Sequence, residues 1–184
     1  MSLIKPHGII LLGANGSGKS TLGRELGRIL DIAHFDVEEY YFYKTGIPYS
    51  AMRPENERRE MLLSDMRKSG AYVVSGDVSN WASEFLTMFD LAVFLTAPKD
   101  IRMQRIENRE YTRWGGRVRE GGDIYKSQLE FKKFAASRDI SLIEQRVSIY
   151  KCSALHIDST EGLLANASKI AEQYLKSPEG NYNG

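Results

Sequence analysis

The chain has 184 residues, of which 42% are hydrophobic and 27% charged, a composition that predicts one soluble globular domain and leaves little room for two. Its formal net charge is +1, so no global positive field recruits nucleic acid or an anionic membrane, and affinity for phosphate has to be built locally. The single cysteine, Cys152, excludes an internal disulfide and a cysteine zinc site; because we find neither a signal peptide nor an apolar run of the ~20 residues that a bilayer span needs, we expect a cytoplasmic protein.

Short apolar runs alternate with segments of helix length, which is typical of an α/β domain with a largely parallel sheet. Runs rich in Val, Ile, Leu and Phe predict five strands, at 8–12, 32–36, 71–75, 91–96 and 155–158. Ser159 or Thr160 is expected to cap a final helix, whose apolar stripe consists of Leu163, Leu164, Ala167, Ile170, Ala171, Tyr174 and Leu175. Residues 177–184 lack an apolar pattern and are expected to form a flexible tail, so the domain spans 1–176.

The first strand leads into a glycine-rich loop that fits the pattern G-x-x-x-x-G-K-[ST] and is followed by a helix. Its residues are Gly13, Ala14, Asn15, Gly16, Ser17, Gly18, Lys19, Ser20 and Thr21. The glycines let successive backbone N–H groups converge, and the helix adds its positive end, so the loop predicts a site for the phosphates of ATP. Lys19 is expected to reach the β- and γ-phosphates and the Ser20 hydroxyl to hold Mg²⁺. The loop alone does not say whether the γ-phosphate is hydrolysed, transferred or only sensed.

Carboxylates follow the second and third predicted strands. In a parallel sheet the ligand crevice lies beyond the carboxyl ends of the strands, so Asp36 and Asp77 are expected to face the phosphate loop. We assign Asp77 with Ser20 to the metal and Asp36 to the hydroxyl of a phosphoryl acceptor, although either carboxylate fits either task and both also suit ordinary turns or helix caps.

Arginines are dense after the fourth strand, at Arg102, Arg105, Arg109, Arg113, Arg117 and Arg119. Arg105, Arg109 and Arg113 share one helix face, and pairs of glycines at 115–116 and 121–122 bracket the last two. This pattern predicts a mobile lid at about 110–123 that closes arginines over a phosphate chain. An exposed basic face paired with neighbouring acidic residues gives the same pattern.

A second long segment, 37–70, is expected to bind the acceptor. Its tyrosines Tyr40, Tyr41, Tyr43 and Tyr49 favour a flat base, whereas Arg53 and Arg58 suit a carboxylate. The stretch that contains these two arginines, "RPENERRE", also fits an exposed charged helix. The residues of this segment therefore leave the identity of the acceptor open.

These motifs resemble the nucleoside monophosphate kinase (adenylate kinase) and shikimate kinase branch of the P-loop kinases. "GANGSGKST" resembles their phosphate loop, "LAVFLTAPKDIRMQRIENR" the fourth strand and arginine helix of adenylate kinases, and "LHIDST" their last strand. The resemblance implies a three-layer α/β/α fold with strand order 2-3-1-4-5, a lid after strand four, and an acceptor-binding segment between strands two and three.

Carried over residue by residue, the resemblance places Arg105 against adenine, Arg109 on the ATP phosphates, and Arg113 or Arg117 on the transferring group. "FDVEEYYFYKTG" is similar to an acceptor stretch of shikimate kinases, which puts Asp36 nearest the acceptor hydroxyl and Glu38 where an aspartate is expected. "VVSGDV" resembles the end of strand three, where shikimate kinases have three glycines and only Gly76 matches.

The sequence therefore predicts a kinase that uses ATP and Mg²⁺ and phosphorylates a small molecule, as a monomer or homodimer without nucleic-acid or membrane partners. A nucleotide or nucleoside is the first choice of acceptor, and a small hydroxylated metabolite is the second. An ATP-binding regulatory module with slow hydrolysis is the alternative of a different class.

Overall fold

The computed structural model describes residues 7–176, so the predicted tail at 177–184 lies outside the described residues. One five-stranded sheet, parallel at every pairing, has the order β2-β3-β1-β4-β5. The strands are β1 (His7–Gly13), β2 (Ala33–Asp36), β3 (Ala71–Ser75), β4 (Leu91–Thr96) and β5 (Ser153–Asp158). All five predicted strands and their order are confirmed, and β3 and β4 have the predicted bounds.

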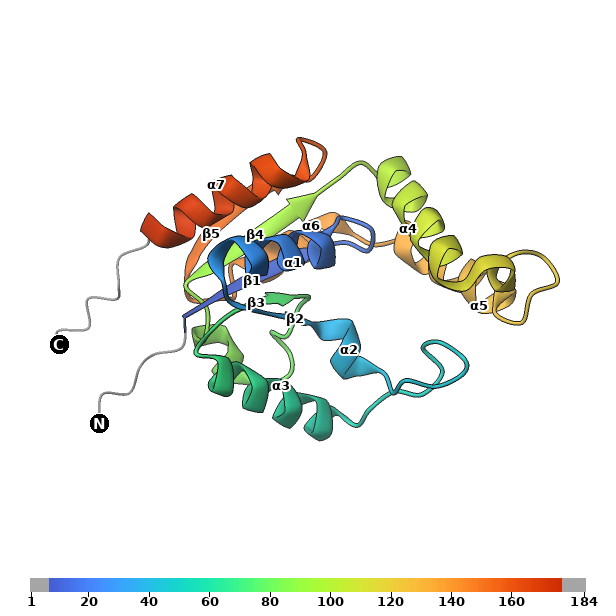
Figure 1. Ribbon diagram of the computed structural model, residues 1–184, viewed down its shortest axis with the longest axis horizontal. Coiled ribbons are helices and arrows are strands. Elements are labelled where there is room, and N and C mark those ends of the chain that lie inside the picture. The colour runs from blue at the N-terminus through green and yellow to red at the C-terminus, as the bar shows by residue number, and fades with distance from the viewer. Residues whose placement is uncertain (1–6, 177–184) are drawn as a thin grey trace.

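Helices cover both faces of this sheet (Figure 1). They are α1 (Lys19–Leu30), α2 (Val37–Tyr41), α3 (Glu55–Ser69), α4 (Lys99–Trp114), α5 (Tyr125–Ala136), α6 (Ile140–Val147) and α7 (Leu163–Lys176), with short 3-10 helices η1 (Ser83–Thr87) and η2 (Gly115–Val118). The predicted three-layer α/β/α fold is thereby confirmed.

Alternation along β1 divides the core into two layers. Ile9 and Leu11 face α1 and α7, while Ile10 and Leu12 face α3 and α6, and all four are at most 1% exposed. A strand covered on both faces has to be apolar at every position, which is why "GIILL" reads as one continuous apolar run. The sheet is thus a rigid base, and its carboxyl-terminal edge is free to carry the site.

The start of α7 differs from the prediction. The helix begins at Leu163, directly after Gly162, whose carbonyl accepts from Asn166 N, and neither Ser159 nor Thr160 caps it. Instead Asp158 Oδ1 accepts from the backbone and hydroxyl of Thr160, which closes a turn before the helix. Ala167, Ile170, Ala171 and Tyr174 of the predicted stripe pack on the sheet, whereas Leu164 and Leu175 are 63% and 73% exposed.

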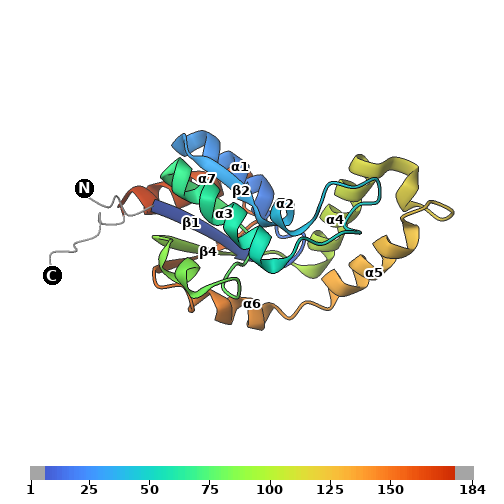
Figure 2. The ribbon, with the colours of Figure 1, turned by 90° about the horizontal axis from the view of Figure 1, so that it is seen from below.

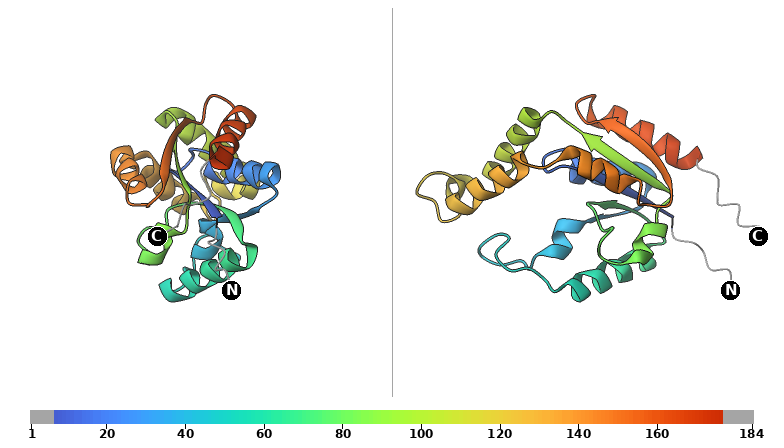
Figure 3. Two further views of the ribbon diagram at one scale, coloured as in Figure 1. Left: turned by 90° about the vertical axis from the view of Figure 1, so that its left-hand side faces the viewer. Right: turned by 180° about the vertical axis from the view of Figure 1, so that it is seen from behind.

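An arm made of α4, η2 and α5 projects beyond the carboxyl-terminal edge of the sheet (Figures 1 and 3). Residues 110–114 of the predicted lid belong to α4, so the part of the predicted lid outside long helices is 115–123. Seen from below, the loop between α2 and α3 reaches alongside this arm (Figure 2). The two are joined by a hydrogen bond, in which Nη1 of Arg113 on α4 donates to Oη of Tyr49 in the loop at 3.2 Å. Two segments, this arm and the α2–α3 loop, therefore project at the edge of the sheet where the phosphate loop joins β1 to α1 (Figure 1).

Among residues 7–176, no helix combines the length and the apolar character that a membrane crossing requires.

Candidate active site

The phosphate loop is the turn between β1 and α1, and its backbone requires glycine. Gly16 and Gly18 have φ of 82° and 100°, in the left-handed region that side chains disfavour. A Cβ on Gly16 would also collide with the backbone carbonyl of Arg102. This close approach lets Arg102, which is 3% exposed, donate from Nη1 to Asn15 O at 3.2 Å. A side chain of α4 thus binds the backbone of the phosphate loop.

Lys19 folds back onto this loop. Its Nζ donates to Gly13 O at 2.8 Å and to Ala14 O at 3.2 Å. Burial lowers the pKa of Lys19 to about 8; Glu38 and Asp36 oppose that shift, and the nearby Arg109 and Arg138 add to it. Burial is therefore what disfavours the ammonium, and an anionic ligand beside it would stabilise the charged form.

One cavity of about 1020 Å³ joins the loop to the rest of the site. It lies at the carboxyl ends of the strands, as predicted, and α4, α6 and the segment after β5 contribute to its walls. Its charged lining residues are the basic Lys19, Arg24, Arg105, Arg109, Arg113, Arg138 and Arg146 and the acidic Asp36, Glu38 and Asp77. Cations outnumber carboxylates more than two to one, so a chain with almost no net charge concentrates a positive potential here.

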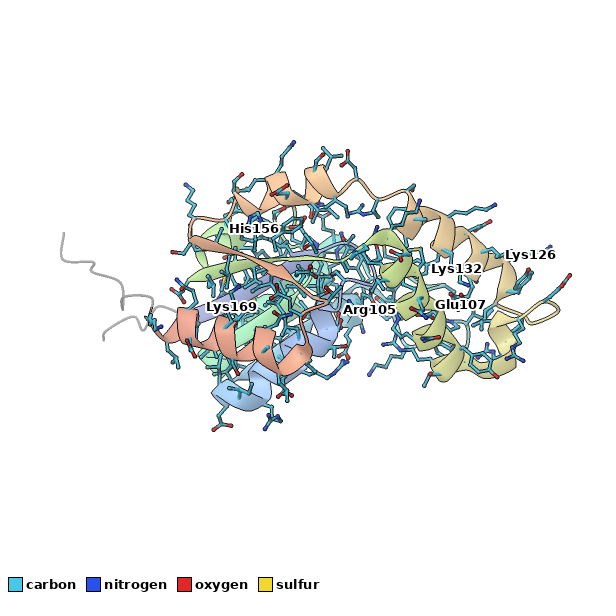
Figure 4. All side chains as sticks on the ribbon, turned by 90° about the horizontal axis from the view of Figure 1, so that it is seen from above. Arg105, Glu107, Lys126, Lys132, His156 and Lys169 are labelled. Atoms are coloured by element: carbon cyan, nitrogen blue, oxygen red, sulfur yellow. The ribbon has the colours of Figure 1, made fainter. Side chains whose placement is uncertain are left out.

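Arg105 connects the loop to the segment after β5. Its Nη1 donates to Ser17 O at 3.3 Å and Ser159 Oγ at 2.8 Å, and its Nη2 donates to Ser159 O at 3.0 Å. In Figure 4 Arg105 lies where α4 meets the body of the molecule. Its guanidinium plane therefore borders the phosphate end of the cavity and the Ser159 segment together.

Arg109 lies one turn further along α4 and lines the same cavity. Its Nε and Nη2 both bind Oε1 of the buried Glu110, each at 2.8 Å. Burial alone would lower the pKa of Arg109, but the carboxylates of Glu110 and Glu38, Glu110 first, outweigh it, so the pKa stays above its usual value. Arg109 is a fixed cation at the cavity wall.

The acceptor-side residues at the ends of β2 and β3 are held by backbone contacts. Asp36 caps α2, where its Oδ1 accepts from Glu38 N at 3.1 Å, and both side chains line the cavity. Gly76 has φ of 126°, and a Cβ there would lie 2.7 Å from Cβ of Val37. A glycine at this position lets the end of β3 pack against the start of α2, next to Asp36.

Asp77 is fully engaged by protein donors. Oδ1 accepts from Ser79 N and Tyr150 Oη, both at 2.9 Å, and Oδ2 accepts from Arg146 Nη1 at 2.6 Å. Although burial would raise the pKa of Asp77, these donors, Arg146 first, lower it below the usual value. Asp77 lines the cavity as a structural link between β3 and α6.

Besides Arg24 on α1, two cavity arginines, Arg138 and Arg146, were not predicted from the sequence. They stand at either end of α6, and Nε of Arg138 is buried without a hydrogen-bond partner among the described residues. The available signal was weak: "SRD" marks a helix start, with Asp139 capping α6, but nothing in the sequence says that α6 returns to the phosphate loop.

Several predicted residues lie away from the cavity lining. Arg53 donates to Glu39 O and Phe42 O, and Arg58 is 7% exposed, with its guanidinium over the rings of Tyr41 and Trp81. Arg117 pairs with Asp123 at 2.7 Å and donates to Gly46 O, so it ties the arm to the α2–α3 loop. Arg113, the other lid candidate, does line the cavity.

Of the four tyrosines, only Tyr41 lines the cavity. Tyr40 donates to Asp65 at 2.8 Å, Tyr43 to Glu57 at 2.7 Å, and Tyr49 accepts from Arg113. The tyrosine-rich segment therefore offers one ring to a ligand.

A family model described as an AAA domain matches residues 9–125, a span that contains the phosphate loop and α4. The chain belongs to this AAA domain family. The uncharacterized protein YqaC of Bacillus subtilis (strain 168) is 36% identical over 138 residues, which are 75% of this chain and 76% of YqaC. The bifunctional shikimate kinase/3-dehydroquinate synthase of Thermotoga maritima is 28% identical over 143 residues, 71% of this chain but 29% of that protein.

Solved structures of shikimate kinases share the fold of this chain. The enzyme from Acinetobacter baumannii in complex with shikimate aligns at a TM-score of 0.54 and 21% identity, over 95% of this chain and 96% of that one. The enzyme from Bacteroides thetaiotaomicron aligns at a TM-score of 0.55 and 19% identity, over 90% of this chain and 97% of that one. The predicted P-loop small-molecule kinase fold is confirmed.

Proposed function

We propose that the chain transfers the γ-phosphoryl group of ATP to a small hydroxylated molecule that carries an anionic group. The observation that carries this proposal is that one cavity is lined by the phosphate loop, by the arginines of α4 and α6, and by the Asp36 carboxylate. Phosphoryl transfer needs positioning and charge stabilisation more than covalent catalysis, and this lining supplies both.

ATP binds with its phosphates on the loop N–H groups and with Lys19 turned from Gly13 O and Ala14 O toward the β- and γ-phosphates. Arg105 and the Ser159 segment flank the adenosine side, as the resemblance to adenylate kinases implies. Arg109 and Arg113 contact the phosphate chain from α4. These roles agree with the cavity lining and with the resemblance of the loop and α4.

Mg²⁺ fits the residues present. The Ser20 hydroxyl lines the cavity at the first turn of α1, and Asp36 uses Oδ1 toward Glu38 N, which leaves Oδ2 for water molecules on a metal ion. Mg²⁺ usually retains several waters and is bound by one or two protein groups and the phosphates. The ion would offset charge on the phosphates during transfer. Both oxygens of Asp77 accept from protein donors, so Asp36 suits this task better than Asp77.

In the transfer step, the acceptor hydroxyl oxygen forms a bond to the γ-phosphorus while the bond from that phosphorus to the β,γ-bridging oxygen breaks. The hydroxyl proton passes to Asp36 or to a water molecule that it orients, and ADP leaves with the former bridging oxygen. Arg109, Arg113 and Lys19 stabilise the charge on the transferring group.

The acceptor side of the cavity favours an anion over a flat base. Arg138 and Arg146 line the cavity at the two ends of α6; Arg146 is paired with Asp77, whereas Nε of Arg138 lacks a hydrogen-bond partner among the described residues and is the donor that an anion would satisfy. From the sequence, the four tyrosines of segment 37–70 favour a nucleotide or nucleoside as the acceptor. Of these four, only Tyr41 lines the cavity. A small hydroxylated acid is therefore our first choice, and nucleoside monophosphates form the second arm of the test.

The test is an ADP-release assay with Mg-ATP across hydroxylated carboxylic acids, nucleosides and nucleoside monophosphates, for the natural chain and for Lys19→Met. Lys126→Met, an exposed lysine on α5 (Figure 4), is the matched control. We expect release that depends on one acid, that Lys126→Met retains, and that Lys19→Met loses by at least about a hundredfold. Release that stays slow with every acceptor would favour a regulatory ATPase and contradict the proposal.

A further inference from the structure

Glu110 is a buried carboxylate on the side of α4 that faces α5. It is 1% exposed, and each of its oxygens is engaged: Oε1 by Arg109, and Oε2 by Nε2 of Gln128 on α5 at 3.3 Å. Gln128 is itself 5% exposed. A buried charge has to be paired and hydrogen-bonded, so this arrangement is tightly constrained.

The ion pair occupies one edge of the Arg109 guanidinium. Glu110 takes the Nε and Nη2 donors, and this pair does not use Nη1. Because Arg109 lines the large cavity and Glu110 is buried beside α5, the unused edge is the part of Arg109 that is available to a ligand in the cavity.

We infer that Glu110 is a positioning residue that fixes Arg109 toward the ATP phosphates, and that Gln128 in turn fixes Glu110; this rests on the proposed function. The contacts form a chain from α5 through α4 to the cavity. An arginine side chain loses much conformational freedom when it binds, and an anchored guanidinium has already lost it before ATP arrives. The position of α5 is thereby linked to how strongly Arg109 binds phosphate.

The test measures binding of fluorescent ATP and AMP analogues, with Mg²⁺ present, to the natural chain and to Glu110→Gln. We expect Glu110→Gln to weaken ATP by about tenfold, the value of one charge-assisted contact, and to weaken AMP much less, because AMP lacks the phosphates that Arg109 contacts. General damage to the fold would weaken both nucleotides alike. Gln128→Met, which keeps Glu110 but removes its second contact, should show a smaller loss in the same direction.

Glu107→Gln is the matched control. Glu107 lies on the same helix, 68% exposed and paired with Lys132 at 3.3 Å, and Figure 4 shows the two between α4 and α5, away from Arg105. We expect it to bind both nucleotides as the natural chain does. Melting temperatures of all variants show whether each has folded.

A double-mutant cycle with Arg109→Met decides whether Glu110 acts through Arg109. We expect Arg109→Met to lose ATP affinity and Glu110→Gln to add no further loss in that background. Additive losses, or an unchanged ATP affinity in Glu110→Gln alone, would overturn this inference and leave the proposed function standing. A natural chain that binds no ATP analogue would overturn both.

Discussion

Lys19 Nζ lies 2.8 Å from the carbonyl oxygen of Gly13, so the loop's only lysine is bound by the loop itself. Burial lowers the pKa of Lys19 to about 8, so its charge is sensitive to mild alkali. ATP attracts the protonated ammonium, and a neutral amine would give that interaction up.

We therefore predict that ATP affinity falls as pH rises through about 8. The loss should reach roughly tenfold by pH 9.5, because the ratio of neutral amine to ammonium rises about tenfold with each pH unit above the pKa, while bound phosphate partly restores the charged form. Isothermal titration calorimetry at several pH values measures this. Lys19→Met should bind weakly with no such dependence, and a wild-type affinity that is constant from pH 7 to 9.5 would contradict the assignment.

The same group predicts a pH dependence of the free energy of unfolding. Lys19 titrates near 8 in the folded chain and near 10.5 when unfolded, so between these values the unfolded state binds more protons. The penalty of burying its charge is present below pH 8 and disappears as pH rises to 10.5. In urea denaturation without nucleotide, Lys19→Met should therefore gain most over the natural chain at pH 7 and least at pH 10.5.

Gly76→Ala tests the contact that sets Asp36 beside the end of β3. The new Cβ would lie 2.7 Å from Cβ of Val37 at a φ of 126°, so we expect a loss of about 1–3 kcal/mol of unfolding free energy. Gly116→Ala is the control, because a Cβ there meets nothing within 4 Å among the described residues. Equal stability of both variants would show that the end of β3 relaxes freely.

Asp77→Asn tests whether Asp77 is a structural link. It should cost about 1–3 kcal/mol, because the buried Tyr150 loses a charged acceptor and the exposed Arg146 loses its carboxylate partner. Arg67→Gln, which breaks the exposed pair with Glu84, should cost at most about 1 kcal/mol. Chemical denaturation measures both, and an unaltered Asp77→Asn would indicate that its carboxylate is free for another role.

The fold was predictable because its signals are local. Each strand is a short run that has to be apolar on both faces, as Ile9 to Leu12 are, and the glycines at 16 and 18 mark a backbone that turns with positive φ. The start of α7 was misplaced because Asp158 competes for Thr160 and closes a turn first, a contact that a capping pattern does not reveal.

The site was predictable only in part, because its acceptor side is assembled from distant segments. Arg138 and Arg146 reach the cavity through the placement of α6, and no spacing in the sequence links them to Lys19. Arg58 carries the charge that an acceptor site needs, but Tyr41 and Trp81 cover it. Composition identifies such residues as candidates, and packing alone decides which of them meet a ligand.

Phosphoryl transfer can be followed directly with ATP that carries a labelled γ-phosphate. The chain, Mg²⁺ and this ATP are incubated with the same acids and nucleotides, and the products are separated into inorganic phosphate and phosphorylated acceptor. Transfer to an acceptor predicts that the label moves to the hydroxyl of one anionic acceptor and that Asp36→Asn abolishes this movement while ATP still binds. Label found in inorganic phosphate alone, at a rate that no acceptor changes, would contradict it.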